Sequence, residues 1–255
     1  MPLSIDAIPT LESNYVWALH DGRHALLVDP GEAGPPLDWL ADKGLELGAL
    51  LITHHHWDHT DGIDEVLAKH PVPVYGPEDH RIPQVDHPLR EGDHVDIESP
   101  QAHFEIISVP GHTSIHIAYF GHRLVLCGDA LFSAGCGRMF EGTPEQMLAS
   151  LDKLADLPAD TRVLCAHEYT LANCRFALAV EPDNADLQAR AREVEALREE
   201  GKMTLPSNIG AERRFNPFLR TREPAVIEAA GKREPGCGSG PVEVFAALRR
   251  WKDDF

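Results

Sequence analysis

The segment LLITHHHWDHTDG, residues 50–62, carries four histidines and two aspartates. His54 and His56 are two residues apart, so their side chains leave the same face of an extended chain. Asp58 and His59 follow where a helix begins, which turns the chain back toward the same point. Imidazole nitrogens and carboxylate oxygens are donors that zinc and related divalent metals accept. The HxHxDH pattern predicts half of a metal site; the alternative is a solvated histidine cluster.

Three more residues of ligand type follow apolar, β-branched runs. HFEIISVPG runs into His112, RLVLCG into Asp129 and TRVLCA into His167, as ALLIT runs into the HxHxDH motif. Ligands at the ends of adjacent strands would meet at one rim of a sheet. The sequence therefore predicts that these residues complete the site.

The candidate ligands outnumber the places around one tetrahedral zinc. They are His54, His56, Asp58, His59, His112, Asp129 and His167. Seven ligands suit two metals that share a carboxylate, about 3.5–4 Å apart, with a hydroxide between them. Coordination lowers the pKa of the bound water to about 7, so a nucleophile forms at neutral pH without a serine or cysteine.

The remaining histidines have no comparable context. His55 points to the opposite face from its neighbours in an extended segment. We expect the others at surface or ordinary polar positions, although one of them, His116, is close to the predicted site in sequence. These are His20, His24, His70, His80, His87, His94, His103, His116 and His122.

Short apolar runs between Gly, Pro and charged turns predict the strands that position these ligands. The runs are LSIDAI, YVWALH, HALLVD, ALLIT, VPVYG, HFEIISV, IHIAYF, RLVLCG and TRVLCA. Helical patterns come between them at about 35–43, 61–70 and 144–156. Thr143 before Pro144 is a favourable helix start, with a hydroxyl N-cap and proline at the first position.

The pattern changes near residue 170. LANCRFALAV, ADLQARAREVEALREE and EVFAALRRWKDDF predict helices, and the β signal ends. We therefore predict an α/β protein with a mixed α/β domain over residues 1–170 and a mostly helical domain over residues 171–255.

The overall charge limits the partners. Lys and Arg total 23 against 41 Asp and Glu, a formal net charge of −18, which repels nucleic acid and anionic membranes. The odd number of cysteines, five without a CxxC pair, favours a reducing, cytoplasmic setting over a disulfide framework. We expect no signal peptide, no membrane span and a monomer.

The motifs THHHWDHTDG, VPGHT, LCGDALF and CAHEYT, in this order, resemble the metallo-β-lactamase superfamily. VDPG, which contains Asp29, resembles the early motif whose aspartate supports the metal loop. LFSAGCGRMFEGT, HEYTLANCRFA, NPFLR and RRWKDDF are similar to the hydroxyacylglutathione hydrolases, also called glyoxalase II. The resemblance spans nearly the whole chain.

The resemblance implies a four-layered αβ/βα sandwich with a C-terminal helical domain. It also implies two divalent metals, with zinc as the first choice and iron or manganese as alternatives. By position, His54, His56 and His112 would bind one metal and Asp58, His59 and His167 the other, with Asp129 bridging. The implied reaction is hydrolysis of S-D-lactoylglutathione and related thioesters, the second step of methylglyoxal detoxification.

The family's glutathione-binding positions match Arg138, Tyr169, Arg249 and Lys252. A basic cluster at the C-terminal helix suits the two carboxylates of glutathione, whereas its structural alternative is a solvated face or a complement to the helix dipole. Phe140 replaces a tyrosine of some members, which removes one possible hydroxyl contact and would weaken substrate affinity. A second departure is an aspartate, at position 61, where glycine is common.

The mechanistic hypothesis is that basic residues hold glutathione while a bridging hydroxide, oriented by Asp58, attacks the thioester carbonyl. The alternatives are a lactone or phosphoester hydrolase on the same fold, a glutathione-persulfide dioxygenase and a non-catalytic metal-binding protein. A β-lactamase is disfavoured, because common zinc β-lactamases lack the histidine at the position of His59 and often have cysteine at that of Asp129.

Overall fold

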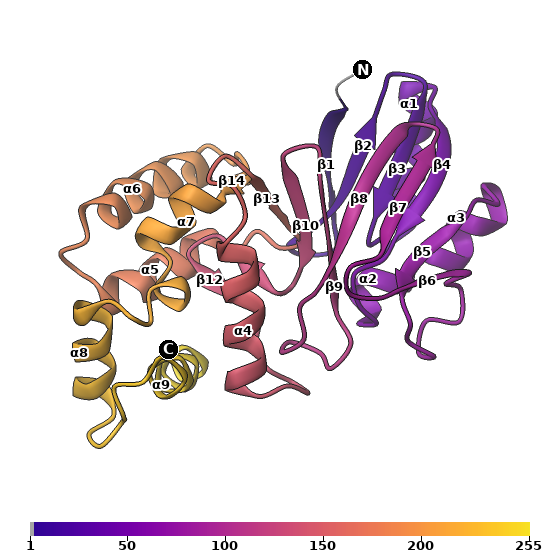
Figure 1. Cartoon of the computed structure of the whole chain (residues 1–255). Helices are drawn as coiled ribbons and strands as arrows, with labels where there is room; N and C mark the ends of the chain where they lie inside the picture. Colours follow the sequence, from indigo (N-terminus) through magenta and orange to yellow (C-terminus); the bar gives the residue numbers. More distant parts are fainter. Residues whose placement is uncertain (1–2) are drawn as a thin grey trace. The chain divides into compact units, whose positions relative to one another are not determined.

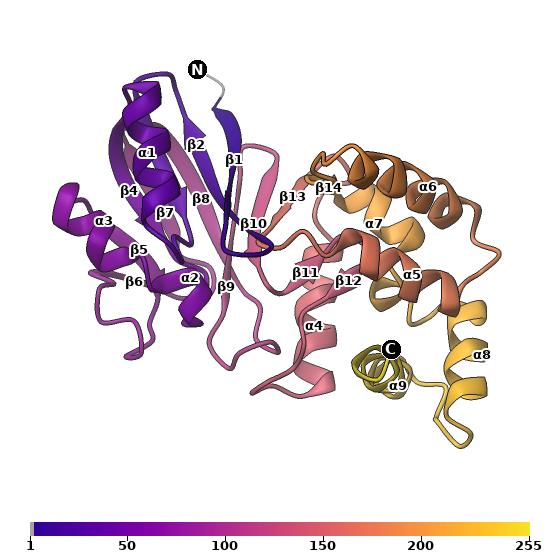
Figure 2. The same cartoon turned by 180° about the vertical axis from the view of Figure 1, so that it is seen from behind.

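The computed structural model describes residues 3–255 (Figures 1 and 2). Contacts divide the chain into two compact units. Unit 1 comprises Met1–Ser108 and Ile115–Gly128, and unit 2 comprises Val109–Ser114 and Asp129–Phe255. The first two residues lie outside the described part of the chain.

Unit 1 contains two sheets with helices on the outer face of the first. The first sheet has the order β1 (Ser4–Thr10), β2 (Asn14–His20), β3 (His24–Val28), β4 (Glu46–Leu51), β5 (Val74–Pro77) and β6 (His87–Leu89). The second contains β7 (His94–Glu98), β8 (Gln101–Ser108), β9 (Ile117–Gly121) and β10 (Leu124–Gly128), paired antiparallel in sequence order. Figure 2 shows the helices α1 (Gly34–Lys43) and α3 (Ile63–Lys69) over the first sheet.

The strands of the first sheet that lead to the metal motif are buried on both faces. β3 and β4 are parallel neighbours, and Leu27 and Leu50 are fully buried. Leu40 of α1 joins the same core. Between the sheets, the hydroxyl of Tyr119 donates to the carbonyl oxygen of Ile52 at 2.9 Å, which satisfies the polar end of a buried ring. A strand covered on both faces gives a continuous apolar run, which explains the ALLIT signal.

Unit 2 contains most of the helices. They are α4 (Pro144–Ala155), α5 (Thr170–Val180), α6 (Ala185–Glu199), α7 (Ile209–Phe215), η1 (Pro217–Leu219), α8 (Pro224–Arg233) and α9 (Pro241–Asp253). Its short strands are β11 (Leu131–Phe132), β12 (Gly135–Cys136), β13 (Arg162–Cys165) and β14 (Ser207–Asn208). α4 packs against α9, and α5 packs against α6. Thr143 caps α4 through a reciprocal capping box with Gln146, which confirms the predicted helix start.

All nine predicted strands and all six predicted helices are present, so the predicted α/β organisation is confirmed at the level of its elements. The sequence missed β6, β7, β11, β12 and β14, the helices α7 and α8, and the short helix η1. Most of these elements are helices of no more than about two turns or strands of fewer than about four residues. Such segments are too short to show a hydrophobic period. None of the described helices is long and apolar enough to cross a membrane.

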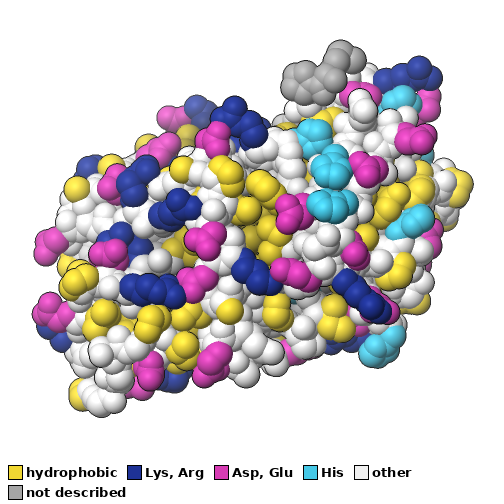
Figure 3. All heavy atoms as spheres, in the orientation of Figure 1, with side chains coloured by type: hydrophobic (Ala, Val, Ile, Leu, Met, Phe, Trp, Pro, Cys, Tyr) yellow, Lys and Arg dark blue, Asp and Glu magenta, His cyan; other side chains and the backbone are white. Residues whose placement is uncertain are grey.

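Figure 3 shows several histidines side by side on one face of the molecule, with others scattered. The rings of His94 and His103 stack with their centroids 5.3 Å apart. His103 Nδ1 lies 2.7 Å from an Asp96 carboxylate oxygen across the strand pair. Both histidines are exposed, which confirms the expectation of surface positions for them.

Candidate metal centre

Four candidate ligands of unit 1 lie together where β4 ends and α2 (Trp57–Thr60) begins. The ring centroid of His54 is 4.8 Å from that of His56 and 4.1 Å from that of His59. His59 Nε2 is 3.5 Å from an oxygen of Asp58. The extended conformation of His56, followed by one helical turn, folds this short segment back on itself. This is the turn that the sequence predicted.

The Nδ1 atoms of two of these histidines face hydrogen-bond acceptors. His59 Nδ1 lies 3.0 Å from Asp29 Oδ2, and His54 Nδ1 lies 3.0 Å from the hydroxyl of Thr53. An imidazole that donates its Nδ1–H keeps a lone pair on Nε2 for a metal. Asp29 has a positive φ of 53°, a conformation that is uncommon for residues other than glycine. Its carboxylate also accepts the backbone N–H and the hydroxyl of Thr53, which holds it in place.

Asp58 is oriented by a residue that the sequence did not suggest. Asn14 at the start of β2 donates from Nδ2 to Asp58 Oδ2 at 3.0 Å and to the Asp58 carbonyl oxygen at 3.2 Å. The side-chain amide therefore fixes both the backbone and the carboxylate of Asp58. Asn14 lies 44 residues before its partner, so no local sequence pattern could have identified it.

His116 is another residue whose place the sequence did not indicate. Its ring stacks on that of His54, with centroids 4.5 Å apart and planes 26° apart. Its side chain is buried rather than at the surface. The residue is packed beside a candidate ligand because β9 begins directly after it and Ile117 donates its backbone N–H to the Thr53 carbonyl oxygen.

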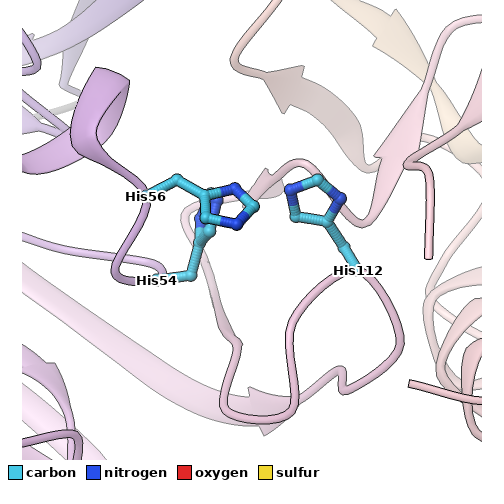
Figure 4. Close-up of side chains that lie close together, drawn as sticks. All are labelled: His54, His56 and His112. Atoms are coloured by element: carbon cyan, nitrogen blue, oxygen red, sulfur yellow. The ribbon is translucent and has the colours of Figure 1, made fainter. Parts of the chain in front are cut away.

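Three candidate ligands lie together in unit 2. His112 is in the loop after β8, Asp129 directly follows β10, and His167 follows β13. Asp129 Oδ2 is 3.4 Å from His112 Nε2 and 3.3 Å from His167 Nε2. One carboxylate oxygen between two imidazole nitrogens is the arrangement expected of a bridging ligand. Figure 4 shows His54 and His56 leaving the segment before α2, and His112 leaving its loop.

In unit 2 the backbone orients His112. His112 Nδ1 lies 2.7 Å from the carbonyl oxygen of Arg138, so its Nε2 keeps the lone pair. The loop is held further by Phe140, whose N–H donates to the His112 carbonyl oxygen. A Cβ on Gly137 would lie 2.0 Å from the Asp129 carbonyl oxygen and 3.0 Å from His112 Nδ1. Glycine is therefore required at this position for the close approach of two chain segments.

The donor chemistry of both clusters fits divalent metals. Donors on one tetrahedral ion with bonds of about 2.0–2.1 Å lie about 3.3 Å apart. The separations of 3.3 and 3.4 Å around Asp129, and of 3.5 Å between His59 and Asp58, match that spacing. Asp29, His54 and His59 also form a buried group. Asp29 faces the Nδ1 side of His59, which assigns it to orienting the ligands rather than to binding.

Two predicted glutathione-binding residues, Arg138 and Tyr169, are accessible, and so is Phe140. Arg138 has a side chain that is 64% exposed and lies over the ring of Phe140, 5.7 Å from its centroid. The phenyl ring contacts His112 edge-on. Tyr169 is 41% exposed and stacks on His167, with centroids 4.6 Å apart. Accessible side chains beside the candidate ligands are suited to binding a substrate.

Arg249 of α9 has a different environment from the one expected. It is 5% exposed, and its guanidinium donates to the Cys136 carbonyl oxygen at 3.1 Å and to Asp253 at 3.1 Å. The Nε of Arg138 is 3.8 Å from the same Asp253 oxygen. Arg249 thus ties α9 to β12, two residues before Arg138. Burial raises the pKa of the Cys136 thiol to about 11.

Lys252 is half-buried on the same helix. Its ammonium lies over the rings of Phe176 and Phe255 and donates to the Ala172 carbonyl oxygen at 3.4 Å. Burial lowers the pKa of Lys252, and the positive charge of Arg249 lowers it further. A partly desolvated cation is suited to receive a carboxylate.

Buried amides and a carboxylate hold the β11–β12 hairpin that joins Asp129 to Arg138. Asn216 of the NPFLR motif donates to the Phe132 and Gly135 carbonyl oxygens at 3.1 and 2.9 Å. Glu212 accepts the Ala134 backbone N–H at 2.8 Å. Burial raises the pKa of the Glu212 carboxyl. The helical part of the chain therefore contributes to the position of the hairpin.

Comparison with known proteins identifies the family. The profile of the metallo-β-lactamase superfamily matches residues 9–167, and the profile described as hydroxyacylglutathione hydrolase C-terminus matches residues 168–255. Relatives named hydroxyacylglutathione hydrolase from Cupriavidus metallidurans and Alkalilimnicola ehrlichii are 52% and 54% identical to this chain. The first alignment covers 99% of both chains and the second 98% of both. The chain belongs to the hydroxyacylglutathione hydrolase family.

Membership in this family confirms the resemblance deduced from the motifs. It makes the chain a metal-dependent hydrolase, and the two histidine and aspartate clusters are consistent with binding of divalent metal.

Solved structures confirm the fold class. The BLEG-1 B3 metallo-β-lactamase superposes with a TM-score of 0.65 at 23% identity, over 85% of this chain and 99% of its own. ETHE1 from Myxococcus xanthus superposes with a TM-score of 0.64 at 24% identity, over 99% and 98%. This hydroxyacylglutathione hydrolase family member therefore has the predicted metallo-β-lactamase fold, with a helical C-terminal region.

Proposed function

We propose that the chain hydrolyses S-D-lactoylglutathione and related 2-hydroxyacylglutathione thioesters to glutathione and the hydroxy acid, as in methylglyoxal detoxification. The observation that carries this proposal is the identity of about half of all positions with relatives of that name over nearly their full length. The match includes residues 168–255, which fit the profile described as hydroxyacylglutathione hydrolase C-terminus.

The proposed metal centre combines both ligand clusters. His54, His56 and His112 would hold one ion, and Asp58, His59 and His167 would hold the other, with Asp129 available to both. The orientation of Nε2 in His54, His59 and His112 supports this assignment. When bound, the two ions lower the pKa of water and stabilise negative charge on the carbonyl oxygen. We propose zinc as the metal because its nitrogen and oxygen donors are all present; iron and manganese also accept them.

The chain's own residues bind and orient the reactants. Asp58, held by Asn14, accepts a hydrogen bond from the attacking water and so aims its lone pair at the thioester carbon. Arg138 and Lys252 pair with the glutathione carboxylates, and Tyr169 contacts the peptide part. In the reaction a carbon–oxygen bond forms and the carbon–sulfur bond breaks. The glutathione thiolate leaves with the electron pair and needs little help from a general acid, and the proton that the attacking water loses ends on this thiolate or in the solvent.

Arg249 has a supporting part in this proposal. Its guanidinium is already engaged by the Cys136 carbonyl oxygen and by Asp253. In this proposal the remaining guanidinium donors of Arg249 bind glutathione. The same side chain holds β12, the strand that precedes Arg138. Phe140 contributes a ring contact without a hydroxyl group.

Three further proposals concern organisation. We propose a catalytic domain over residues 1–170 and a glutathione-binding helical domain over residues 171–255, supported by the profile match that begins at residue 168.

We propose a monomer that binds neither nucleic acid nor membrane, on the basis of the net charge of −18. A cytoplasmic setting is supported by the cysteines, none of which forms a disulfide among the described residues.

The decisive experiment measures loss of the thioester absorbance of S-D-lactoylglutathione with purified protein and determines metal content by elemental analysis. His56→Ala is the test variant, and His87→Ala, an exposed histidine stacked on Tyr75, is its matched control. The proposal expects about two metals per chain and rapid hydrolysis in wild type and control. It expects both metal content and hydrolysis to fall in His56→Ala.

Full metal content without hydrolysis would overturn the proposed substrate. Oxygen uptake with glutathione persulfide would then identify a dioxygenase, and turnover of a lactone or phosphoester would identify another hydrolase. Two metals retained by His56→Ala would overturn the proposed ligand set.

A further inference from the structure

Thr53 lies between the end of β4 and the first histidine of the metal motif, and its side chain is fully buried. Its hydroxyl oxygen is 2.7 Å from Asp29 Oδ2 and 3.0 Å from His54 Nδ1. Its backbone N–H donates to Asp29 Oδ1 at 2.8 Å. The threonine thus connects one carboxylate to one candidate ligand.

The number of protons decides the direction of these hydrogen bonds. A hydroxyl has one proton, and an ionised carboxylate only accepts. The Thr53 hydroxyl therefore donates to Asp29 and accepts from His54 Nδ1–H. A neutral imidazole with its proton on Nδ1 has its lone pair on Nε2.

We propose that Thr53 is a positioning residue that holds His54 in the Nδ1–H tautomer and so presents Nε2 to the metal. This inference rests on the proposed role of His54 as a metal ligand. Asp29 then orients two histidines at once. It reaches His59 directly, at 3.0 Å from Nδ1, and His54 through the Thr53 hydroxyl.

The packing leaves Thr53 and His54 little freedom to rearrange. A Cβ on Gly128 would lie 2.4 Å from the Thr53 hydroxyl oxygen. The glycine therefore allows the end of β10 to lie close against Thr53. His116 stacks on the face of His54. Ile117 donates its N–H to the Thr53 carbonyl oxygen at 3.0 Å. The hydroxyl is therefore held at the position where it accepts from the imidazole.

The variants Thr53→Val and Thr53→Ser test the inference. Valine keeps the branched shape but neither donates nor accepts a hydrogen bond, whereas serine keeps the hydroxyl. Thr161→Val is the matched control, since Thr161 is equally buried and its hydroxyl has no hydrogen-bond partner among the described residues. Metal affinity is measured on the metal-loaded proteins by competition with a chelator, without substrate.

We expect Thr53→Val to bind the ion assigned to His54, His56 and His112 about 10–100-fold less tightly, the usual effect of losing a residue that orients a ligand. Thr53→Ser and Thr161→Val should keep the affinity of wild type. Equal affinity in Thr53→Val and wild type, or equal losses in the valine and serine variants, would overturn the inference. Wild-type protein that binds no metal would instead overturn the proposed metal centre.

A spectroscopic measurement on wild type keeps the inference testable if Thr53→Val does not fold. Long-range nitrogen–proton NMR correlations of the zinc-loaded protein, with His54→Gln to assign the signals, report which ring nitrogen carries the proton. The inference expects the proton of His54 on Nδ1. A proton on Nε2 would overturn it.

Discussion

The two ligand clusters are oriented by different means. In unit 1 the ligands are almost consecutive in sequence, and side chains orient them: Asp29 for His59, and Asn14 for Asp58. In unit 2 the ligands are far apart in sequence. There a backbone carbonyl orients His112, and a glycine allows the chain segments to meet.

This difference has a physical basis. A short segment cannot bend its backbone freely enough to satisfy every ligand, so other side chains must complete the hydrogen bonds around it. Ligands on separate loops can be aimed by the loops themselves, because backbone carbonyls offer acceptors at every residue. Substitutions of side chains should therefore affect the cluster of unit 1 most. Changes that disturb the backbone should affect that of unit 2 most.

The largest effect is expected from removing a ligand of one ion from either cluster. His59→Ala and His167→Ala each remove a proposed ligand of the same ion, one from each cluster. We expect each variant to bind one metal instead of two and to lose at least about 1000-fold in kcat/KM, because a metal supplies several kcal/mol of transition-state stabilisation. Elemental analysis and thioester hydrolysis measure both quantities. If the double variant loses a further metal, the two residues do not share an ion.

Gly137→Ala tests the role of the backbone in unit 2. The added Cβ would lie 2.0 Å from the Asp129 carbonyl oxygen, so the loops must separate. We expect a loss of about 1–3 kcal/mol in the free energy of unfolding and about 100-fold in kcat/KM, the effect of misplacing a catalytic group by about 1 Å. Gly34→Ala, with no atom within 4 Å of the added Cβ, is the control. An unchanged melting curve would contradict the required close approach.

Asn14→Ala tests orientation by a side chain in unit 1. The substitution removes both hydrogen bonds to Asp58. We expect kcat to fall about tenfold, at the lower end of the effect of residues that orient ligands, with little change in KM. Steady-state kinetics separates the two parameters. Asn208→Ala, which removes a helix cap in unit 2, should leave kcat unchanged if the effect is specific.

The smallest expected effect is a gain. Phe140 is 62% exposed, so Phe140→Tyr adds a hydroxyl without burying it. One added hydrogen bond to glutathione contributes about 0.5–1.5 kcal/mol, which corresponds to a fall in KM of about 2–10-fold. Neither cluster changes, so kcat and metal content should stay the same. An unchanged KM would show that the phenyl position does not reach the substrate.

The sequence predicted the main strands and helices because each carries enough periodic residues to reveal its pattern. It could not predict β11 and β12, two residues each, which are held by Asn216 and Glu212 from far along the chain. The same limit applies to the site. Asn14 and His116 have ordinary sequence contexts, and only their contacts with Asp58 and His54 reveal a connection.

The sequence by itself determined the chemistry of this protein: the HxHxDH motif, the strand-end ligands and the family motifs name the donors and the reaction class. Residue type and spacing suffice there, because a metal selects donors by their chemistry. The tertiary structure decided which nitrogen each histidine presents. Asp29 faces His59, Thr53 faces His54, and the Arg138 carbonyl oxygen faces His112. Two of these partners are distant in sequence, and a tautomer is set by the atom on the other side of the ring.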